Sequence, residues 1–363
     1  MKVDYYIGPR GSESEMCGIE RYLTSVLPHL SGKTDPKFIG FKALQKIPIT
    51  IQEYALYPIK IRKERRKDSV SCFISQDTAY LLNLLSFNRS VVICYDLIHY
   101  LRPEYSFIIK NKIKISIAGM KRADRIITIS NHVKKQIAEY LNYPEERIDV
   151  AYPGVDFEKF KPFTPSSNFL EKYGIGNIDP NIILYVGSEH PRMNLNTLIK
   201  ALYFVKKKCP DIKFLKVGRP QFQGAREKFL ALIKSLGLER NVIFIDYVEE
   251  EHLPAIYNAA SLLVYPVLEA GFGLPPLEAM ACGTPVITSN TASLPEVVGD
   301  AGIMVNPYDT DKLSEMILKV LTDNSLQKKL SEKGLNRARQ FTWENTAKTI
   351  FKTFEKLREI HNI

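Results

Sequence analysis

A glycine-rich turn that leads into a helix is the segment of this sequence best suited to bind an anionic or hydroxyl-rich ligand. Residues 269–273 read Glu-Ala-Gly-Phe-Gly, and Glu278 falls in the first turn of the helix expected after them. Glycines let backbone N–H groups approach a ligand closely, and a helix start adds about half a positive charge. The Glu278 carboxylate either accepts hydrogen bonds from a vicinal diol such as ribose or is only a favourable first-turn acid.

A second polar loop, Gly187–Asn194, follows another strand-like run and holds one cation, Arg192. The planar fork of an arginine guanidinium suits phosphate oxygens. A surface loop with a single arginine is also an ordinary feature of proteins, so Arg192 alone does not define a site.

The first half of the sequence offers further polar groups after its predicted strands. Gly18 opens a predicted helix after a polar loop, and Tyr95-Asp96 follows a strand-like run, with His99 nearby. A lone histidine is more often structural than catalytic. The glycines ahead of Gly18 lack the spacing of a dinucleotide-binding fingerprint, which disfavours a nicotinamide dehydrogenase.

Two observations bear on metals and on cysteine chemistry. Asp309-Thr310-Asp311 has the spelling of a metal-binding Asp-x-Asp motif, but it precedes a helical pattern and is expected to be a helix N-cap. We therefore expect no metal and no other cofactor. The five cysteines are scattered, without the spacing of a disulfide framework or a zinc site, and this favours a reducing cytoplasm.

Short β-branched and aromatic runs alternate with helical patterns through nearly the whole chain, which is typical of parallel βαβ units. Ligands of open parallel sheets bind beyond the carboxyl ends of the strands, where the loops described above lie. The predicted strands of the first half are Lys2–Gly8, Val70–Ser75, Val91–Tyr95, Arg125–Ile129 and Ile148–Tyr152. Those of the second half are Ile182–Val186, Phe214–Val217, Val242–Ile245, Leu262–Tyr265, Pro285–Thr288 and Gly302–Val305.

The length of 363 residues and the repeated plan predict two domains. Residues 161–168 are poor in apolar side chains and broken twice by proline, so they are a plausible linker. We place the first domain at 1–165 and the second at 166–342. An amphipathic segment from Trp343 follows the last strand of the second sheet.

The net charge of +10 is uneven, since residues 1–165 hold 26 Lys and Arg against 18 Asp and Glu. Two basic segments stand out, Lys60–Lys67 and the lysines of 110–122. They are either a solvated loop and an ordinary half-buried helix, or a surface that meets anionic lipid headgroups. No run of about 18 apolar residues and no cleaved signal is found, so we expect a soluble, cytoplasmic protein, peripheral on the inner face of the membrane under the lipid interpretation.

The stretch Ala270–Glu296 resembles the donor-binding region of glycosyltransferase family 4, a group with the GT-B fold. The shared pattern is Gly-Phe-Gly-Leu-Pro, a glutamate at Glu278, and Ala-Met-Ala-Cys-Gly-Thr-Pro-Val. The resemblance covers nearly the whole chain and is weakest between residues 31 and 70. It implies that Glu278 binds the ribose and that Arg192 neutralises the donor diphosphate. The donor-binding residues that it implies are Gly18, Ser188, Arg192, Asn194, Gly271, Phe272, Gly273, Leu274 and Glu278.

Three positions depart from the family pattern. The glutamate that holds donor sugar hydroxyls falls on Ala270, the usual lysine of the diphosphate loop is Met193, and the sugar-contacting histidine is Tyr95. Glu269 lies one residue before Ala270 and either reaches the sugar through a rearranged turn or points elsewhere. The catalytic candidates are therefore Arg192, Glu269, Tyr95 and Asp96.

The resemblance implies two doubly wound Rossmann-like domains that face a central cleft, with the closing segment, 343–361, crossing back onto the first domain. It also implies a retaining, metal-independent hexosyltransferase of polysaccharide or glycoconjugate biosynthesis. The donor is a nucleotide-diphosphate sugar, with mannose as the expected hexose, and the acceptor is a glycan or a lipid-linked molecule. No nucleic-acid partner is expected.

Two other functions remain open at this point. A non-catalytic nucleotide-sugar or glycan-binding partner protein would explain why three expected polar contacts are altered. A sugar-nucleotide epimerase of the same fold would need acid and base groups in the cleft, for which Glu269 and His99 are the loose candidates.

Overall fold

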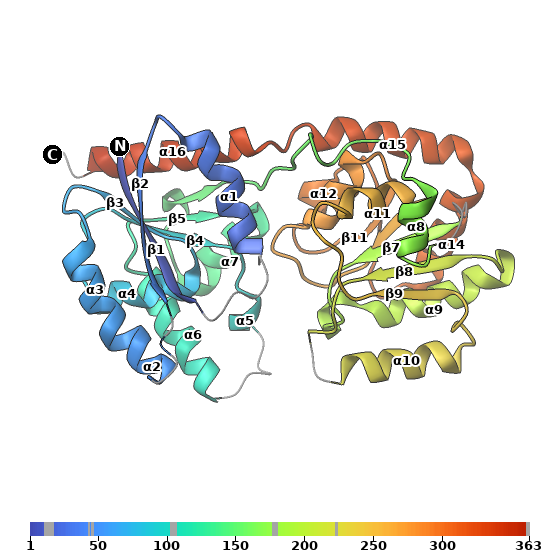
Figure 1. The fold of residues 1–363 in the computed structure, drawn as a ribbon, viewed down its shortest axis with the longest axis horizontal. Coiled ribbons are helices and arrows are strands. Elements are labelled where there is room, and N and C mark those ends of the chain that lie inside the picture. The colour runs from blue at the N-terminus through green and yellow to red at the C-terminus, as the bar shows by residue number, and fades with distance from the viewer. Residues whose placement is uncertain are drawn as a thin grey trace. The chain divides into compact units, whose positions relative to one another are not determined.

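Two parallel β-sheets organise the chain in the computed structural model (Figure 1), which describes residues 1–10, 18–42, 44, 47–101, 107–175, 181–221 and 224–360. The chain divides into unit 1, formed by Met1–Gly154 with Trp343–Ile363, and unit 2, formed by Val155–Thr342. Each unit contains one six-stranded sheet in which all paired strands are parallel. The two α/β halves predicted from the alternating pattern are therefore present.

Unit 1 has the strand order β2-β1-β3-β4-β5-β6. Its inner strands β3, β4 and β5 are buried at every position, because helices cover both faces of the sheet. The elements of unit 1 are β1 (Lys2–Arg10), α1 (Gly18–Leu30), β2 (Asp35–Lys42), α2 (Ile49–Ile51), η1 (Gln52–Leu56), α3 (Tyr57–Glu64), β3 (Val70–Phe73), η2 (Gln76–Tyr80), α4 (Leu81–Leu84), β4 (Ser90–Cys94), α5 (Ile98–Leu101), α6 (Phe107–Met120), β5 (Arg125–Thr128), α7 (Asn131–Leu141), η3 (Glu145–Arg147), β6 (Ile148–Val150) and α16 (Trp343–Ile360).

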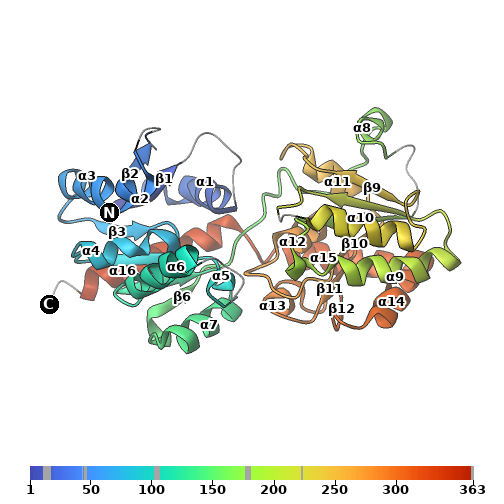
Figure 2. The ribbon, with the colours of Figure 1, turned by 90° about the horizontal axis from the view of Figure 1, so that it is seen from below.

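Unit 2 has the strand order β12-β11-β10-β7-β8-β9, so the chain builds outward from β7 to β9 and then returns to add β10 beside β7. The carboxyl ends of β7 and β10 thus flank the point where the strand order reverses. Helices α9 and α14 pack side by side in this unit (Figure 2). The elements of unit 2 are α8 (Ser167–Lys172), β7 (Ile182–Val186), η4 (Pro191–Met193), α9 (Leu195–Lys208), β8 (Lys213–Val217), α10 (Ala225–Ser235), β9 (Val242–Ile245), α11 (Leu253–Ala259), β10 (Leu262–Tyr265), α12 (Leu274–Ala281), β11 (Val286–Ser289), α13 (Leu294–Val298), β12 (Ile303–Val305), α14 (Thr310–Thr322) and α15 (Asn324–Ala338).

Every strand predicted from the sequence overlaps an observed strand, but β2 was missed. This strand lies at the edge of its sheet and pairs with β1 alone. An edge strand tolerates proline and exposed side chains, and β2 contains Pro36 together with the 45% exposed Phe38. Its residues therefore lack the continuous apolar run that identifies the central strands.

Helix α16 is held on unit 1 by a polar cluster around Asp149. Its carboxylate accepts hydrogen bonds from Arg125 Nε at 2.8 Å, Thr353 Oγ1 at 2.9 Å and Lys356 Nζ at 2.7 Å. Burial alone raises the pKa of Asp149, but the hydrogen bonds from Arg125 and Lys356 outweigh it and lower the pKa below its usual value. The carboxylate therefore stays charged and fastens α16 to the end of β6.

The proline-broken segment between the halves packs on unit 2, and the division between the units falls before it, at Gly154. Asn258 Nδ2 donates to Lys161 O at 3.0 Å, and its Oδ1 accepts from Phe163 N at 3.0 Å. The Phe160 ring also lies 6.1 Å from the ring of Tyr257. These contacts explain why the observed division lies upstream of residue 165.

Helix α6 approaches η2 so closely that one position has room only for glycine. A Cβ atom on Gly119 would lie 1.9 Å from the carbonyl oxygen of Ala79, which is backbone and cannot move aside. We expect Gly119→Ala to lower the free energy of unfolding by about 1–3 kcal/mol through overpacking. Urea unfolding of the full chain measures this loss.

Gly40→Ala is the matched control, because a Cβ there would meet Ile7 Cβ at an ordinary 3.8 Å. A Gly119→Ala variant as stable as the Gly40→Ala variant would contradict the close approach of α6 and η2.

Candidate functional site

The loops that follow β7 and β10 meet at the carboxyl edge of the unit 2 sheet. Leu268 N donates to Arg192 O at 2.8 Å, which joins the two loops through their backbones. Beneath them, the rings of Tyr185 and Tyr265 stack with centroids 5.8 Å apart. The loop Gly187–Asn194 and the segment that leads into the glycine-rich turn are far apart in the sequence but are neighbours in the structure.

Asn194 ties these loops to a third one. Its side-chain Nδ2 donates to Pro266 O at 3.0 Å and to Pro307 O at 2.7 Å, while Oδ1 accepts from Thr197 Oγ1 at 2.7 Å. The residue has φ 56°, a left-handed conformation that asparagine tolerates better than most residues. The amide thus fixes the loops after β7, β10 and β12 relative to one another.

The loop after β7 also approaches the loop after β8 closely through two glycines. Gly187 has φ 153° and Gly218 has φ 115°. A Cβ atom on Gly218 would lie 2.5 Å from Gly187 O, so this contact requires glycine.

Arg192 projects from η4 at the junction of the loops and is half-buried. Its NH1 donates to Glu269 O at 3.2 Å, and its backbone N–H donates to His190 Nδ1 at 3.3 Å. Burial raises the pKa of Tyr265 to about 12 although the Arg192 charge opposes the shift, so the hydroxyl stays neutral. The guanidinium is the cation that this junction offers to an anion.

The side chain of Ser293 binds the backbone of the glycine-rich turn. Its Oγ lies 2.9 Å from Ala270 O and 2.6 Å from Phe272 O and donates its proton to one of them. The Phe272 side chain is buried against the ring of Phe341, so only its backbone is at hand for a ligand. Gly273, with φ 116°, is the N-cap of α12, which begins at Leu274.

Glu278 is 2% exposed and lies in the second turn of α12, which begins at Leu274. Its interpretation as a first-turn acid is therefore wrong, because the helix starts earlier than the sequence pattern indicated. Its Oε2 accepts a hydrogen bond from Tyr257 OH at 2.7 Å. Sequence reasoning missed both Tyr257 and Ser293, since neither differs in pattern from an ordinary core or loop residue.

The remaining predicted site residues of the second half fit around these groups. Ser188 is half-buried and its carbonyl oxygen accepts from Tyr185 OH at 3.1 Å. Gly271 and Leu274 are half-buried, Glu269 is half-buried, and Met193 is buried. The predicted residues of the β7 loop and of the glycine-rich turn thus lie in loops that are joined at one edge of the unit 2 sheet, while Glu278 lies in α12 against Tyr257.

The first-half predictions lie in unit 1. Gly18 is the first residue of α1, while residues 11–17 and the side chain of His99 lie outside the described part of the chain. Asp96 Oδ1 accepts from Ile98 N at 3.0 Å at the start of α5. The Tyr95 ring meets the Tyr22 ring edge-on at 5.5 Å, and its hydroxyl oxygen is buried.

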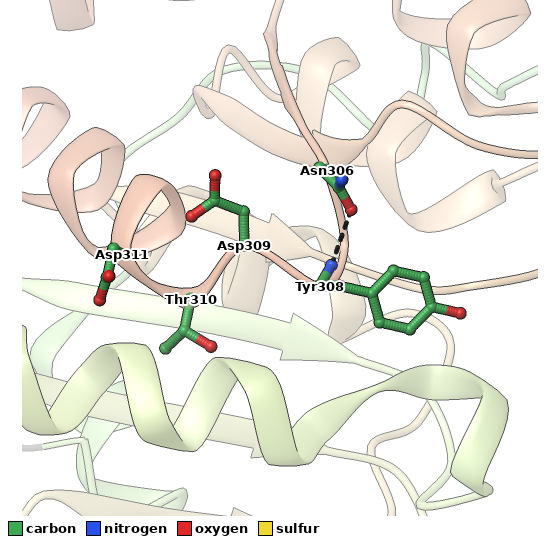
Figure 3. A pocket seen from close by; sticks show the side chains of 5 residues that line it. All are labelled: Asn306, Tyr308, Asp309, Thr310 and Asp311. Atoms are coloured by element: carbon green, nitrogen blue, oxygen red, sulfur yellow. Dashed lines mark hydrogen bonds between the residues drawn. The ribbon is translucent and has the colours of Figure 1, made fainter.

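Asp309 caps α14, as the sequence predicted, because its Oδ1 accepts from Lys312 N at 2.8 Å. It lies in an open hollow of about 440 Å³ (Figure 3). The residues that line this hollow are Asn306, Tyr308, Asp309, Thr310 and Asp311.

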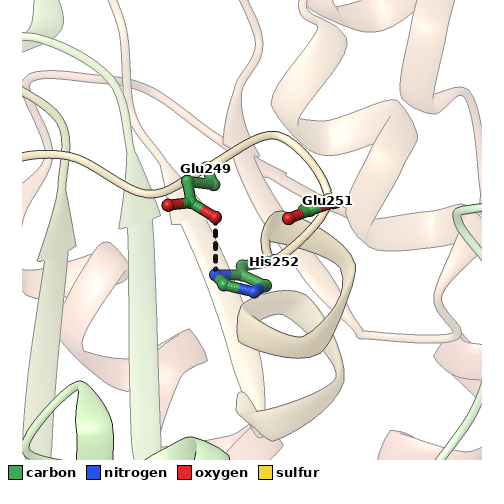
Figure 4. Close-up of side chains that lie close together, drawn as sticks. All are labelled: Glu249, Glu251 and His252. Atoms are coloured by element: carbon green, nitrogen blue, oxygen red, sulfur yellow. Dashed lines mark ion pairs between the residues drawn. The ribbon is translucent and has the colours of Figure 1, made fainter.

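A second polar group lies after β9, where Glu249, Glu251 and His252 have side-chain atoms within 4.8 Å of one another (Figure 4). His252 Nδ1 lies 2.8 Å from Tyr173 OH and 3.6 Å from Glu249 Oε2, and both acids are exposed. Those contacts account for the histidine as part of the packing between α8 and α11.

Comparison with protein families gives matches in both halves of the chain. The model described as Glycosyl transferases group 1 matches residues 171–337, and the model described as Glycosyltransferase Family 4 matches residues 56–159. The first match contains the loops after β7 and β10.

Curated relatives with similar sequences include two proteins of Escherichia coli. O-antigen chain mannosyltransferase B is 31% identical over 338 residues, which cover 89% of this chain and 86% of that protein. The serotype-specific mannosyltransferase WbdA is 31% identical over 307 residues, which cover 79% of this chain and 36% of that protein.

Solved structures share the whole fold. HepE from Anabaena, in complex with UDP-glucose, has a TM-score of 0.81 and 20% identity over 98% of this chain and 100% of that one. Sucrose-phosphate synthase from Thermosynechococcus elongatus has a TM-score of 0.77 and 19% identity over 99% of both chains. The fold is therefore the two-domain α/β GT-B fold predicted from the sequence.

The Asn194 amide predicts a measurable contribution to stability. Asn194→Gly keeps the left-handed backbone accessible but removes the bonds to Pro266 O, Pro307 O and Thr197, so we expect unfolding to need about 1–3 kcal/mol less. Asn194→Ala should lose roughly 1–2 kcal/mol more, because alanine is strained at this φ. Urea unfolding of both variants separates the two effects, and a Gly variant as stable as the wild type would refute the role of the amide.

Proposed function

We propose a reaction for this chain, which belongs to the group 1 glycosyltransferases of family 4 and uses a nucleotide sugar as its donor. The chain transfers mannose, without a metal ion and with retention of anomeric configuration, to a glycan or lipid-linked acceptor. Mannose is supported by the two mannosyltransferases that are each 31% identical to this chain.

The observation that carries the proposal is the position of Arg192. Its backbone carbonyl and its guanidinium both bond to the glycine-rich loop, at Leu268 N and Glu269 O. A cation is thereby fixed where the strand order reverses, against the loop that leads through the glycine-rich turn into α12, a combination that suits a diphosphate. Ser188 and Asn194 complete the donor-binding loop of unit 2.

Glu278 binds the ribose of the donor in this proposal. A carboxylate can accept about four hydrogen bonds, so the bond from Tyr257 fixes Oε2 without exhausting that capacity. The backbone of Gly271, Gly273 and Leu274, with that of Phe272, lines the donor next to it.

Catalysis rests on leaving-group stabilisation and positioning, because the site residues supply no evident nucleophile. The departing diphosphate oxygen accepts the proton of the acceptor hydroxyl on the same face of the sugar, which retains the configuration. Arg192 and the start of α12 stabilise the negative charge that develops. Glu269 positions the sugar on unit 2, and Tyr95 and Asp96 bind the acceptor on unit 1.

A non-catalytic sugar-binding protein is the second candidate function. It is favoured by Ala270, which offers no side-chain hydrogen bond to a sugar, and by the buried Met193 in place of a cation. The buried hydroxyl oxygen of Tyr95 points the same way.

A transfer assay separates the two candidates. We expect one donor of a panel of GDP-, UDP- and ADP-linked sugars, GDP-mannose first, to raise the melting temperature and to give a glycosylated product. Arg192→Ala should lower kcat/KM by about 10²- to 10³-fold, because one charged donor to the leaving group is lost. Glu278→Gln should weaken donor binding, and Lys200→Ala, an exposed change on α9, should match the wild type.

The same assay tests the chemistry. An unchanged rate in EDTA and a product with the anomeric configuration of the donor, measured by NMR, are the expected results. Donor binding without any product over the acceptor panel would favour the non-catalytic candidate, and an inverted product would refute retention.

We also propose that unit 1 meets an anionic membrane surface. Lys110, Lys114 and the 40% exposed Ile115 face solvent on α6, and Lys112 Nζ bonds to Glu53 Oε2 of η1 at 2.7 Å. Helices α2 and α3, on either side of η1 in the chain, expose more apolar side chains, namely Ile49, Ile51 and Ile59. None of the described helices is both long and apolar enough to cross a membrane, so binding would use this surface.

The basic segment 60–67 contributes less to such a surface than its composition indicated. Lys60 to Glu64 are the end of helix α3, not a loop. Arg66 turns inward and bonds to Asp4 Oδ1 at 2.7 Å and Asp35 Oδ2 at 2.7 Å.

In the variant Lys110→Glu/Lys114→Glu, a smaller fraction of the protein should sediment with vesicles that contain phosphatidylglycerol. The reason is that each lysine contributes about 1 kcal/mol to the free energy of binding near an anionic surface. The control Lys328→Glu/Lys329→Glu makes the same charge change on α15. Equal binding by both variants, or binding to neutral vesicles alone, would refute this surface.

A further inference from the structure

A buried cluster of charges lies beneath the middle of the loop that carries Arg192. The side chains of Glu189 and Lys216 are 1% and 0% exposed, and Lys216 Nζ lies 2.9 Å from Glu189 Oε1. Arg226 donates from Nε to the same carboxylate oxygen at 2.7 Å and from NH2 to Asp246 Oδ1 at 2.5 Å.

A buried ion pair of this kind is not needed for stability in general. Removing two charges from water costs several kcal/mol, and an apolar pair of similar volume is often as stable or more so. Burial lowers the pKa of Lys216, an effect that its ion pair with Glu189 opposes. Glu189 Oε2 is also buried and has no hydrogen-bond partner among the described residues.

The cluster is built to hold one loop. Lys216 belongs to β8 and also donates to Gly218 O, the residue that touches Gly187 at the base of the loop. Arg226 belongs to the first turn of α10, and its guanidinium lies 4.4 Å from the Phe244 ring centroid. A strand, β8, and a helix, α10, therefore both bind one side chain of the loop, that of Glu189.

Glu189 precedes Arg192 by three residues. Between them, His190 Nδ1 accepts from Arg192 N and Pro191 begins the turn η4, so the short chain between the two has little freedom. Holding the Glu189 side chain in place therefore also restricts the backbone of Arg192 and so the position of its guanidinium. Two sets of contacts therefore fix Arg192. One is the pairing of Glu189 with Lys216 and Arg226, and the other is the hydrogen bonds of Arg192 to Leu268 N and Glu269 O.

We propose that Lys216 and Arg226, acting through Glu189, are positioning residues that fix the Arg192 guanidinium for the leaving diphosphate. The inference rests on the proposed transfer reaction for its kinetic effect, but not for its structural effect. None of the three residues contacts the donor in this account.

The test is the double variant Glu189→Leu/Lys216→Met, which replaces the buried ion pair by apolar side chains. We expect a melting temperature close to that of the wild type but a loss of roughly 10- to 100-fold in kcat/KM, carried mainly by kcat, because Arg192 is displaced from the developing charge. Hydrogen exchange at Leu268 N, which bonds to Arg192 O, should become faster.

Arg226→Met covers the case in which the double variant fails to fold, since it releases one of the two contacts to Glu189 and leaves the buried Glu189–Lys216 ion pair intact. It should show the same faster exchange and a smaller loss of kcat. Lys213→Met is the matched control at the other end of β8, and it should change neither measurement.

The outcomes separate this inference from the proposed function. A folded double variant with wild-type kcat/KM and wild-type exchange at Leu268 would overturn the inference while the transferase stands. If the wild type neither transfers sugar nor binds a nucleoside diphosphate, the proposed function fails. The exchange at Leu268 in the variants then still decides whether the cluster holds the loop.

Discussion

The hydrogen bonds of the Asn194 side-chain amide are the interaction on which the candidate site depends most. The amide donates to Pro266 O and Pro307 O while Thr197 holds its oxygen, so one residue of the β7 loop fixes the loops after β10 and β12. A buried loop needs partners for its polar backbone groups, and here the partners are also the means of alignment. The positions of Arg192 and of the glycine-rich turn follow from this alignment.

The half-buried guanidinium of Arg192 brings a positive charge to the junction of the loops. The next residue, where family 4 usually has a lysine, is the buried Met193, so that position adds no second charge. A cation is useful to a diphosphate only if it is held in place, because misplacement weakens its interaction with the developing charge. The buried cluster around Glu189 and the backbone bond to Leu268 both serve that requirement.

The parts of this protein that could be predicted are those in which the residue types favour one secondary structure and one degree of burial. The central strands were predicted because helices on both faces require a continuous apolar run. Strand β2 was not, because an edge strand with Pro36 and an exposed Phe38 has no such run. The start of α12 was placed too late, since Gly273, in a left-handed conformation, caps the helix before the apolar pattern becomes regular.

By itself, the sequence determined the two parallel α/β halves, the loop that carries Arg192, and the glycine-rich turn with the helix after it. These are local properties, set by apolar periodicity, glycine positions and charge type. The GT-B fold was expected only from the resemblance of the motifs to family 4. Only the tertiary structure decided that Tyr257 holds Glu278, that Ser293 shapes the glycine-rich turn, and that Glu189 is gripped by Lys216 and Arg226. The physical reason is that a hydrogen bond or ion pair between residues distant in sequence leaves no periodic trace in either segment and exists only once the sheet brings them together.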